Sequence, residues 1–296
     1  MPDATFFQTP AWLRILTNSF DRLQTGWITM RHGASLEGFM PFAEIGRGPF
    51  RTLWSLPLGT YGDPVSADER AAGELLGAFI RMASEWRCLE AGAVLFGTGA
   101  PLELPSGLNQ RREESRVIEL EGSFEHYRSK LLAAKRRQLC NRALEAGVEI
   151  RLLDEPERLK EFYGIYESES AEWGGVHPYP FALFEELFAH RDKGVLFLGA
   201  YLDDEFLGGH IDFFFGKEAQ AWQAGLTERA ADYEVSALLV IRAVEEAYRR
   251  GMERFNLGCS NGNEGIIFFK ESLGGKEHIY SIIETAKRWY RLLRRR

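Results

Sequence analysis

Three hydrophobic runs of strand length follow one another in the second half of the chain, at residues 194–202, 206–215 and 219–226. Short polar turns separate them, Asp203-Asp204-Glu205 and Gly216-Lys217-Glu218. Turns this short can join only neighbouring antiparallel strands, so the pattern predicts a meander.

The hydrophobic period then changes from strand-like to helical. Leucine, isoleucine, valine and tyrosine recur every three or four positions within residues 236–250, and charged residues occupy the other face. Ser236 is a suitable N-cap and Gly251 a suitable stop signal. Because the strand predicted at 254–258 follows a helical crossover, we expect it to lie parallel to its neighbour.

The first half shows a looser copy of this order. The pattern predicts a short helix at 10–18, and then strands at 26–31, 36–44 and 51–56, a helix at 67–87 and a strand at 93–97. Between the halves it predicts a strand at 116–120, one long helix at 124–146, a strand at 148–153 and a helix at 155–172. The chain is therefore expected to have an α/β fold with mixed, mostly antiparallel sheets, in two domains at 1–147 and 148–296.

Charge and composition narrow the possible functions. The 296 residues carry a formal net charge of -7, which argues against general wrapping of nucleic acid. Basic clusters at 130–142 and 287–296 could hold a phosphate-rich ligand or an anionic membrane surface, or could be solvated helix faces. Three scattered cysteines, no signal peptide and no apolar run of membrane-spanning length predict a cytoplasmic location.

The segment with the clearest chemical potential lies near the C-terminus. A predicted buried strand ends at Gly258-Cys259, and a short apolar helix follows, with Lys270 directly behind two phenylalanines. An ammonium group there suits a carbonyl, carboxylate or phosphate in a cleft.

Several stretches in their order resemble the FemAB-like branch of the GNAT acyltransferase superfamily. They are Phe7-Gln8-Thr9-Pro10-Ala11-Trp12, Gly59-Thr60-Tyr61-Gly62, the basic stretch 134–149, the strand 251–258, Phe268-Phe269-Lys270 and Gly274-Gly275. Together they span nearly the whole chain.

The resemblance implies two tandem GNAT-like domains of the acyl-CoA N-acyltransferase type, with residues 278–296 returning to pack on the first. Members of this branch transfer an acyl or aminoacyl group to an amine, often on a peptidoglycan precursor, and related proteins are associated with exopolysaccharide or lipid modification. Aminoacyl-tRNA is the donor of the best-known members. The long coiled-coil arm of some members is missing here.

The chain also departs from ordinary GNAT enzymes before the helix at 236–250. Those enzymes present a glycine-containing turn to the pyrophosphate of coenzyme A. Residues 227–235 contain Glu228, Asp232 and Glu234 and no glycine. Aminoacyl-tRNA and acyl-CoA both remain possible donors, and we expect no tightly bound cofactor and no metal.

Lys270 is the first candidate catalytic residue, because a fixed cation can stabilise the oxyanion that forms when an amine attacks an ester or thioester. His210 and Asp212 alternate on one strand and share a face, so they are either a general base with its partner or a structural pair.

Other residues are candidates for substrate binding, through aromatic stacking, phosphate binding or loop geometry. A packing or solvent-exposed role is the alternative for each of them. They are Trp12, Tyr61, Lys135, Arg136, Arg137, Arg142, Trp173, His177, Tyr179, Asn256, Asn261 and Phe269.

Three functions follow from these observations. The first is transfer of an acyl or aminoacyl group onto an amine of a cell-wall, exopolysaccharide or lipid-linked precursor, with a phosphate-bearing substrate as partner and tRNA as a candidate donor. The second is acyl-CoA-dependent acetyl transfer. The third is a non-enzymatic GNAT scaffold that contacts a membrane through its basic C-terminus.

Overall fold

The computed structural model describes residues 4–97, 108–171 and 178–286, which form two compact units. The first contains the chain up to Glu114 and from His278 onward, and the second contains Ser115–Glu277. The predicted boundary at residue 147 is therefore replaced by one at residue 114. The reason is that residues 115–147 contribute Ile118, Tyr127 and Cys140 to the core of the second unit.

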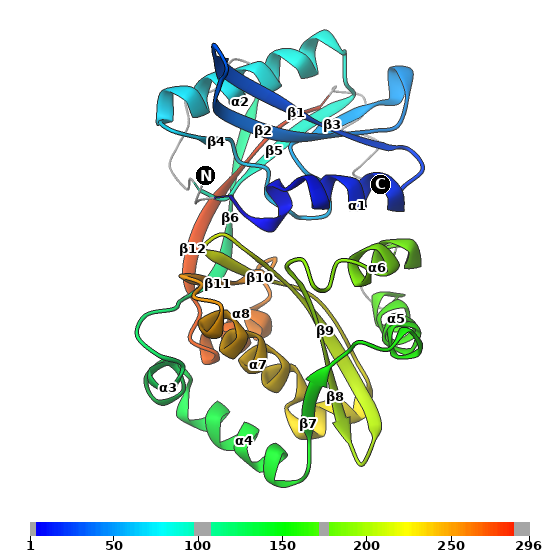
Figure 1. Cartoon of the computed structure of the whole chain (residues 1–296), viewed down its shortest axis with the longest axis vertical. Helices are drawn as coiled ribbons and strands as arrows, with labels where there is room; N and C mark the ends of the chain where they lie inside the picture. Colours follow the sequence, from blue (N-terminus) through cyan, green and yellow to red (C-terminus); the bar gives the residue numbers. More distant parts are fainter. Residues whose placement is uncertain (1–3, 98–107, 172–177, 287–296) are drawn as a thin grey trace. The chain divides into compact units, whose positions relative to one another are not determined.

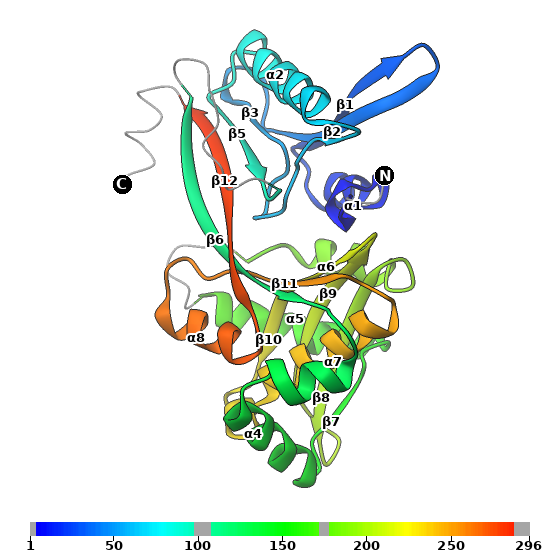
Figure 2. The ribbon, with the colours of Figure 1, turned by 90° about the vertical axis from the view of Figure 1, so that its left-hand side faces the viewer.

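The first unit is a sheet with the strand order β1-β2-β3-β5-β12 and helices against it. Strands β3 and β5 are parallel, whereas β12 pairs antiparallel with β5 (Figure 2). Its elements are α1 (Pro10–Ser19), β1 (Leu23–His32), β2 (Ser35–Ile45), β3 (Thr52–Trp54), β4 (Val65–Ser66), α2 (Glu69–Glu85), β5 (Glu90–Leu95) and β12 (Lys276–Ala286).

Side-chain caps fix where the two helices of this unit begin. Thr9 accepts a hydrogen bond from the Trp12 N–H at 3.2 Å, and Asp68 accepts one from the Ala71 N–H at 2.7 Å. The apolar face of α2 then packs through Leu75 and Phe79 on the sheet.

The second unit has the strand order β6-β11-β10-β9-β8-β7. Its elements are β6 (Asn109–Glu119), α3 (Phe124–His126), α4 (Ala134–Glu145), β7 (Glu149–Leu152), α5 (Pro156–Ala171), α6 (Phe181–Phe188), β8 (Val195–Leu202), β9 (Glu205–Phe215), β10 (Glu218–Leu226), α7 (Val235–Arg249), β11 (Arg254–Cys259) and α8 (Glu264–Ser272). Helix α7 covers one face of β8, β9 and β10, and α5 and α6 cover the other (Figure 1).

The mixed, mostly antiparallel sheet and the meander β8-β9-β10 are confirmed. Strand β11 pairs parallel with β10, as the helical crossover predicted. The N-cap prediction was wrong: α7 begins at Val235, after Glu234 in the left-handed conformation with φ +53°, and Ser236 lies inside the helix.

The predicted long helix at 124–146 is interrupted. A π-helical turn, Tyr127–Leu131, follows α3, and Ala133 is extended before α4 begins. The Ala133 N–H donates to the Ser272 carbonyl at 3.0 Å, and the Tyr127 hydroxyl donates to the Leu273 carbonyl at 3.0 Å. Where the helix is interrupted, the chain therefore forms hydrogen bonds to the end of α8 in place of helical ones.

Within the described ranges, no helix combines the length and the apolar character needed to cross a membrane.

Candidate functional site

The parallel strands β10 and β11 separate at one end of their pairing. Their register runs from Glu218 opposite Arg254 to Gln220 opposite Asn256, and both strands continue beyond that point without pairing to each other. A register shift between Ala221 and Gln223 bends β10 on its other edge. The C-terminal end of β11 thus has an edge that does not pair with β10, and side chains of other elements can form hydrogen bonds there.

Lys270 occupies this strand end. Asn263 caps the start of α8, and its side chain accepts a hydrogen bond from the Ile266 N–H at 3.1 Å. Near the other end of α8, Lys270 Nζ donates to the Gly258 carbonyl at 2.8 Å and to the Cys259 carbonyl at 2.7 Å. An ammonium group has three N–H donors, so one remains for a ligand.

Burial changes the acidity of this ammonium group. It lowers the pKa of Lys270 to about 8; the neighbouring Cys259 acts to raise it, and Arg116 lowers it further. The group can therefore exchange its proton near neutral pH, which an exposed lysine does not do.

The loop beneath Lys270 is held by Asn256, which is fully buried. Its Oδ1 accepts hydrogen bonds from the Ser115 hydroxyl at 2.6 Å and from the Gly258 N–H at 2.9 Å. Gly258 has φ +77°, a conformation that glycine adopts without strain. Of the two roles open to Asn256, shaping the loop is the one these contacts show.

A cleft of about 660 Å³ lies beside the start of α7. Phe269, next to Lys270 in the chain, lines it together with Arg136 of α4. The Arg136 guanidinium lies 5.2 Å from the Phe269 ring centroid, donates to the Ser272 hydroxyl at 3.1 Å and pairs with Glu234. Glu228 also lines the cleft, so two of the three acidic residues of the loop 227–235 lie here.

The His210–Asp212 pair is buried inside the second unit, on strand β9. His210 Nδ1 is 2.9 Å from Asp212 Oδ2, and Asp212 is fully buried. Its strand neighbours are Leu198 opposite His210 and Leu196 opposite Asp212, and both leucines belong to the core under α7. Burial raises the pKa of the Asp212 carboxyl although His210 acts to lower it.

Residues 129–270 match the family model described as acetyltransferase (GNAT) domain. This matching segment of the second unit is similar to a GNAT domain, and we refer to it by that name. The match supports acyl transfer as the general class of reaction. Comparison with curated protein sequences found no match.

Solved structures share the fold of the GNAT domain and of the whole chain. The crystal structure of FemX has a TM-score of 0.71 at 10% identity, covering 95% of this chain and 92% of that chain. The C-terminal domain of a putative lysylphosphatidylglycerol synthetase from Agrobacterium fabrum has 0.64 at 15%, covering 97% and 91%. L-PGS from Bacillus licheniformis has 0.58 at 14%, covering 95% and 88%. At these identities the likeness is one of fold, and the predicted resemblance in fold to FemX is thereby confirmed.

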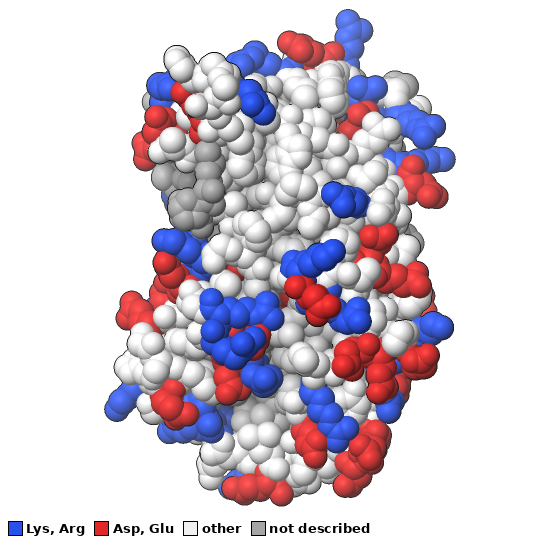
Figure 3. Space-filling view, in the orientation of Figure 1, with Lys and Arg blue, Asp and Glu red and all other residues white. Residues whose placement is uncertain are grey.

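The basic residues of α4 in the GNAT domain do not act as one group. Arg136 points to the cleft, whereas Arg137 Nη1 donates to the Arg128 carbonyl at 2.7 Å. Lys135 is exposed, and Arg142 lines a shallow hollow with Glu145. Acidic side chains also lie among the basic ones on the face of this unit that Figure 3 shows.

Two aromatic candidates of the first unit are packed in its core. Trp12 is fully buried, with its ring centroid 5.4 Å from that of Phe7. Tyr61 is also buried and stacks on Phe96 at 4.2 Å. The predicted ligand role is corrected to packing for both, because neither ring presents a face to solvent.

In the GNAT domain, Tyr179 stacks on Trp222 with the rings 5.6 Å apart, and burial raises its pKa to about 12. Asn261 has φ +49° and is 3.2 Å from the Cys259 sulfur through its Oδ1. Trp173 and His177 lie outside the described residues, as does the basic tail at 287–296.

Sequence reasoning missed two residues beside the strand end. Arg116 pairs with Glu271 at 3.1 Å and lies close enough to lower the pKa of Lys270. Ser115 fixes Asn256. They come from β6, far from β11 in sequence, and only the pairing of these two strands brings them together.

In the part of the chain that the structure describes, no group of three or more His, Cys, Asp and Glu side chains could hold a metal ion.

Proposed function

We propose that this protein is an N-acyltransferase that moves an acyl or aminoacyl group onto an amine of a cell-wall, exopolysaccharide or lipid-linked precursor. The observation that carries the proposal is the half-buried ammonium group of Lys270 at the separated ends of β10 and β11. The similarity of the fold to FemX and to lysylphosphatidylglycerol synthetases supports the same class of reaction.

Lys270 has the geometry of an oxyanion donor. Two of its N–H groups are fixed by the carbonyls of Gly258 and Cys259, so the third has a defined direction. When the acceptor amine attacks the donor carbonyl carbon, the carbonyl oxygen gains negative charge, which this N–H stabilises. The carbon–oxygen or carbon–sulfur bond to the carrier then breaks, and the proton of the attacking amine passes to the departing oxygen or sulfur, so that an amide and a free hydroxyl or thiol are formed.

We assign His210 and Asp212 a structural part in this scheme. The pair lies in the core under α7, and the contacts of Lys270 are with other residues. The chemistry therefore depends on positioning and on the electrostatic effect of Lys270.

We infer that the donor is an aminoacyl ester rather than coenzyme A. The cleft at the start of α7 carries Glu228 and Glu234, which repel a pyrophosphate, and no glycine lies between residues 227 and 235 to let one approach.

Acetyl-CoA is the second candidate donor, because the matching family model is described as an acetyltransferase. Thermal unfolding with and without acetyl-CoA separates the two. A ligand at 100 times its dissociation constant stabilises by about 2.7 kcal/mol, so a clear rise in Tm would favour coenzyme A.

The deciding experiment replaces Lys270 by methionine, which keeps the length of the side chain and removes its charge. Label transferred to an amine is measured with a pool of labelled aminoacyl-tRNAs, and separately with labelled acetyl-CoA, using a cell-envelope precursor extract as acceptor. We expect Lys270→Met to lose transfer by at least about a hundredfold, as for an oxyanion donor.

Lys160→Met is the matched control, because Lys160 is an exposed lysine of α5 and lines neither the cleft nor the strand end. Near-UV circular dichroism of both variants checks their folding. Transfer that is unchanged in a folded Lys270→Met protein would remove the proposal.

A further inference from the structure

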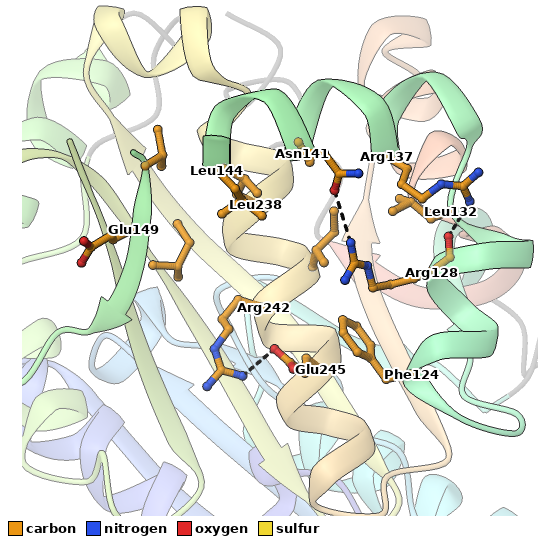
Figure 4. Close-up of a pocket in the computed structure, with 14 residues that line it drawn as sticks. Phe124, Arg128, Leu132, Arg137, Asn141, Leu144, Glu149, Leu238, Arg242 and Glu245 are labelled. Carbon is orange, nitrogen blue, oxygen red and sulfur yellow. Dashed lines mark hydrogen bonds and ion pairs between the residues drawn. The ribbon is translucent and has the colours of Figure 1, made fainter. Parts of the chain in front are cut away.

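A second hollow lies between α4 and α7 of the GNAT domain, apart from the cleft beside Lys270 (Figure 4). We call it the α4–α7 groove. Its volume is about 430 Å³, and none of its lining residues lines the cleft. The polar residues among them are Arg128, Arg137, Asn141, Glu149, Arg242 and Glu245.

The floor of the groove is apolar. Leu132, Val148 and Leu238 are buried at its base, and Leu144 forms an exposed part of the wall. The thiol of Cys140 also lies here, and burial raises its pKa to about 11, so it stays neutral. This surface can accept hydrocarbon without leaving a charge unpaired.

Cationic groups gather at one end of the groove. Arg128 Nη2 donates to Asn141 Oδ1 at 3.2 Å, and Arg137 Nη1 donates to the Arg128 and Ser129 carbonyls at 2.7 and 3.1 Å. These bonds fix both guanidinium groups and leave further N–H donors on each, since arginine has five. In Figure 4, Glu149 lies at the opposite end, on β7.

The remaining arginine of the groove is neutralised locally. Arg242 Nη1 pairs with Glu245 at 2.9 Å on the same helix. The unbalanced positive charge therefore lies at the Arg128–Arg137 end, next to the π-helical turn that carries Arg128. π-Helical turns are frequent at functional sites.

We propose that the α4–α7 groove binds a single-chain amphiphile with a phosphate head group, such as a lysophospholipid. The phosphate contacts Arg128 and Arg137, and the hydrocarbon chain lies along Leu132, Leu238 and Leu144. The volume falls within the range of small-molecule pockets, roughly 300–1,000 Å³, whereas a helix of about 10 Å diameter needs a longer open groove.

The α4–α7 groove and its proposed amphiphile are separate from the cleft and from the transfer reaction. Helices α4 and α7 line both hollows, through Arg136 and Val235 in the cleft and Arg137 and Leu238 in the groove. A ligand in the groove would thus contact the same two helices that form the wall of the cleft.

Isothermal titration calorimetry with dodecyl phosphate, below its micelle concentration, tests the proposal on the full chain. Inorganic phosphate and dodecyl maltoside are the comparison probes, for the head group alone and for the chain alone. We expect saturable binding of dodecyl phosphate that is at least about tenfold tighter than that of either comparison probe, because both ends of the ligand find partners.

Three variants locate the ligand. Replacing Arg128 and Arg137 together by glutamine should weaken dodecyl phosphate at least about tenfold, the cost of losing charge-assisted hydrogen bonds, and leave dodecyl maltoside unaffected. Leu144→Glu should weaken both, and its exposed position allows the variant to fold. Lys135→Gln makes the same change of charge at an exposed position of α4 outside the groove, and should change neither.

The proposal fails if inorganic phosphate binds as tightly as dodecyl phosphate, since the groove would then hold a free anion only. It also fails if the arginine variant or Leu144→Glu, shown to be folded by near-UV circular dichroism, binds dodecyl phosphate like the unchanged protein.

Discussion

The described residues of each unit include a parallel pair of strands, β3 with β5 and β10 with β11, and the ends of the two pairs are held in different ways. In the first unit the chain beyond Trp54 stays bonded to β5: the Ser55 N–H donates to the Gly92 carbonyl at 2.8 Å, and the Gly62 N–H donates to the Val94 carbonyl at 3.2 Å. The Val94 N–H in turn donates to the Ser55 hydroxyl at 3.1 Å.

In the second unit the corresponding strand end is held by side chains. Asn256 accepts the Gly258 N–H, and Lys270 donates to the carbonyls of Gly258 and Cys259. Backbone partners close the first strand end, whereas the second depends on an amide and on an ammonium group that titrates near neutral pH. The proposed oxyanion donor thus belongs to the strand end that side chains hold.

The largest effect on stability from packing is expected when a side-chain atom is added at the end of the parallel pair in the first unit. In Gly62→Ala the new Cβ would lie 2.6 Å from the Ser55 hydroxyl oxygen and 2.7 Å from its backbone carbon. We expect a loss of about 3 kcal/mol in the free energy of unfolding, at the upper end for overpacking, measured by urea denaturation.

Gly258→Ala is the counterpart in the second unit. The atoms nearest to its new Cβ are 3.7 Å away, so only the positive φ disfavours alanine there, and the expected loss is roughly 1 kcal/mol. Equal losses would contradict the comparison.

A smaller effect should follow from removing the amide that holds the second strand end. Asn256→Ala leaves the Gly258 N–H and the Ser115 hydroxyl without this acceptor. The cost is about 2 kcal/mol, within the range for unsatisfied buried groups, and urea denaturation measures it. We also expect transfer activity to fall, because the carbonyls that orient Lys270 lose their support. A stable variant with full activity would show that the loop keeps its shape without Asn256.

A further effect concerns the dependence of stability on pH. The pKa of Lys270 falls from its ordinary value of 10.5 to about 8 in the folded protein. Between these values the unfolded chain binds more protons than the folded one, so the free energy of unfolding contributed by Lys270 rises with pH from about 8 to 10.5. Below pH 8 Lys270 is charged in a partly desolvated site, which lowers the free energy of unfolding.

The comparison of wild type with Lys270→Met, unfolded in urea at several pH values, isolates this contribution. Transfer should decline above pH 8 in the unchanged protein, because the proposed oxyanion donor loses its proton. A difference in stability that stays flat across this range would contradict the assigned pKa.

Local patterns predicted much of the second unit. The meander β8-β9-β10, the helix α7 and the parallel strand β11 follow from apolar runs, turn residues and helical period, which are properties of neighbouring residues. The position of Lys270 after a strand and two phenylalanines was also evident from the sequence. In the structure its ammonium group donates a hydrogen bond to the Gly258 carbonyl at the end of that strand.

The rest depends on contacts between distant parts of the chain. The break before α4 is compensated by hydrogen bonds to the end of α8, and the unit boundary at residue 114 follows from packing in the second core. Trp12 and Tyr61 carry aromatic rings that suit a core or a pocket equally, and only the packing of Phe7 and Phe96 against them decides. Periodicity contains no information about such pairs.

The neighbouring positions of Arg136 and Arg137 give α4 a property that its charge does not reveal. Successive helical residues differ by about 100° in direction, which is why one guanidinium lines the cleft and the next lines the groove. Inserting a single residue ahead of this pair would keep every positive charge and yet turn a different side chain toward each hollow. The phase of this helix, and not only its number of basic residues, therefore decides which side chain lines each hollow.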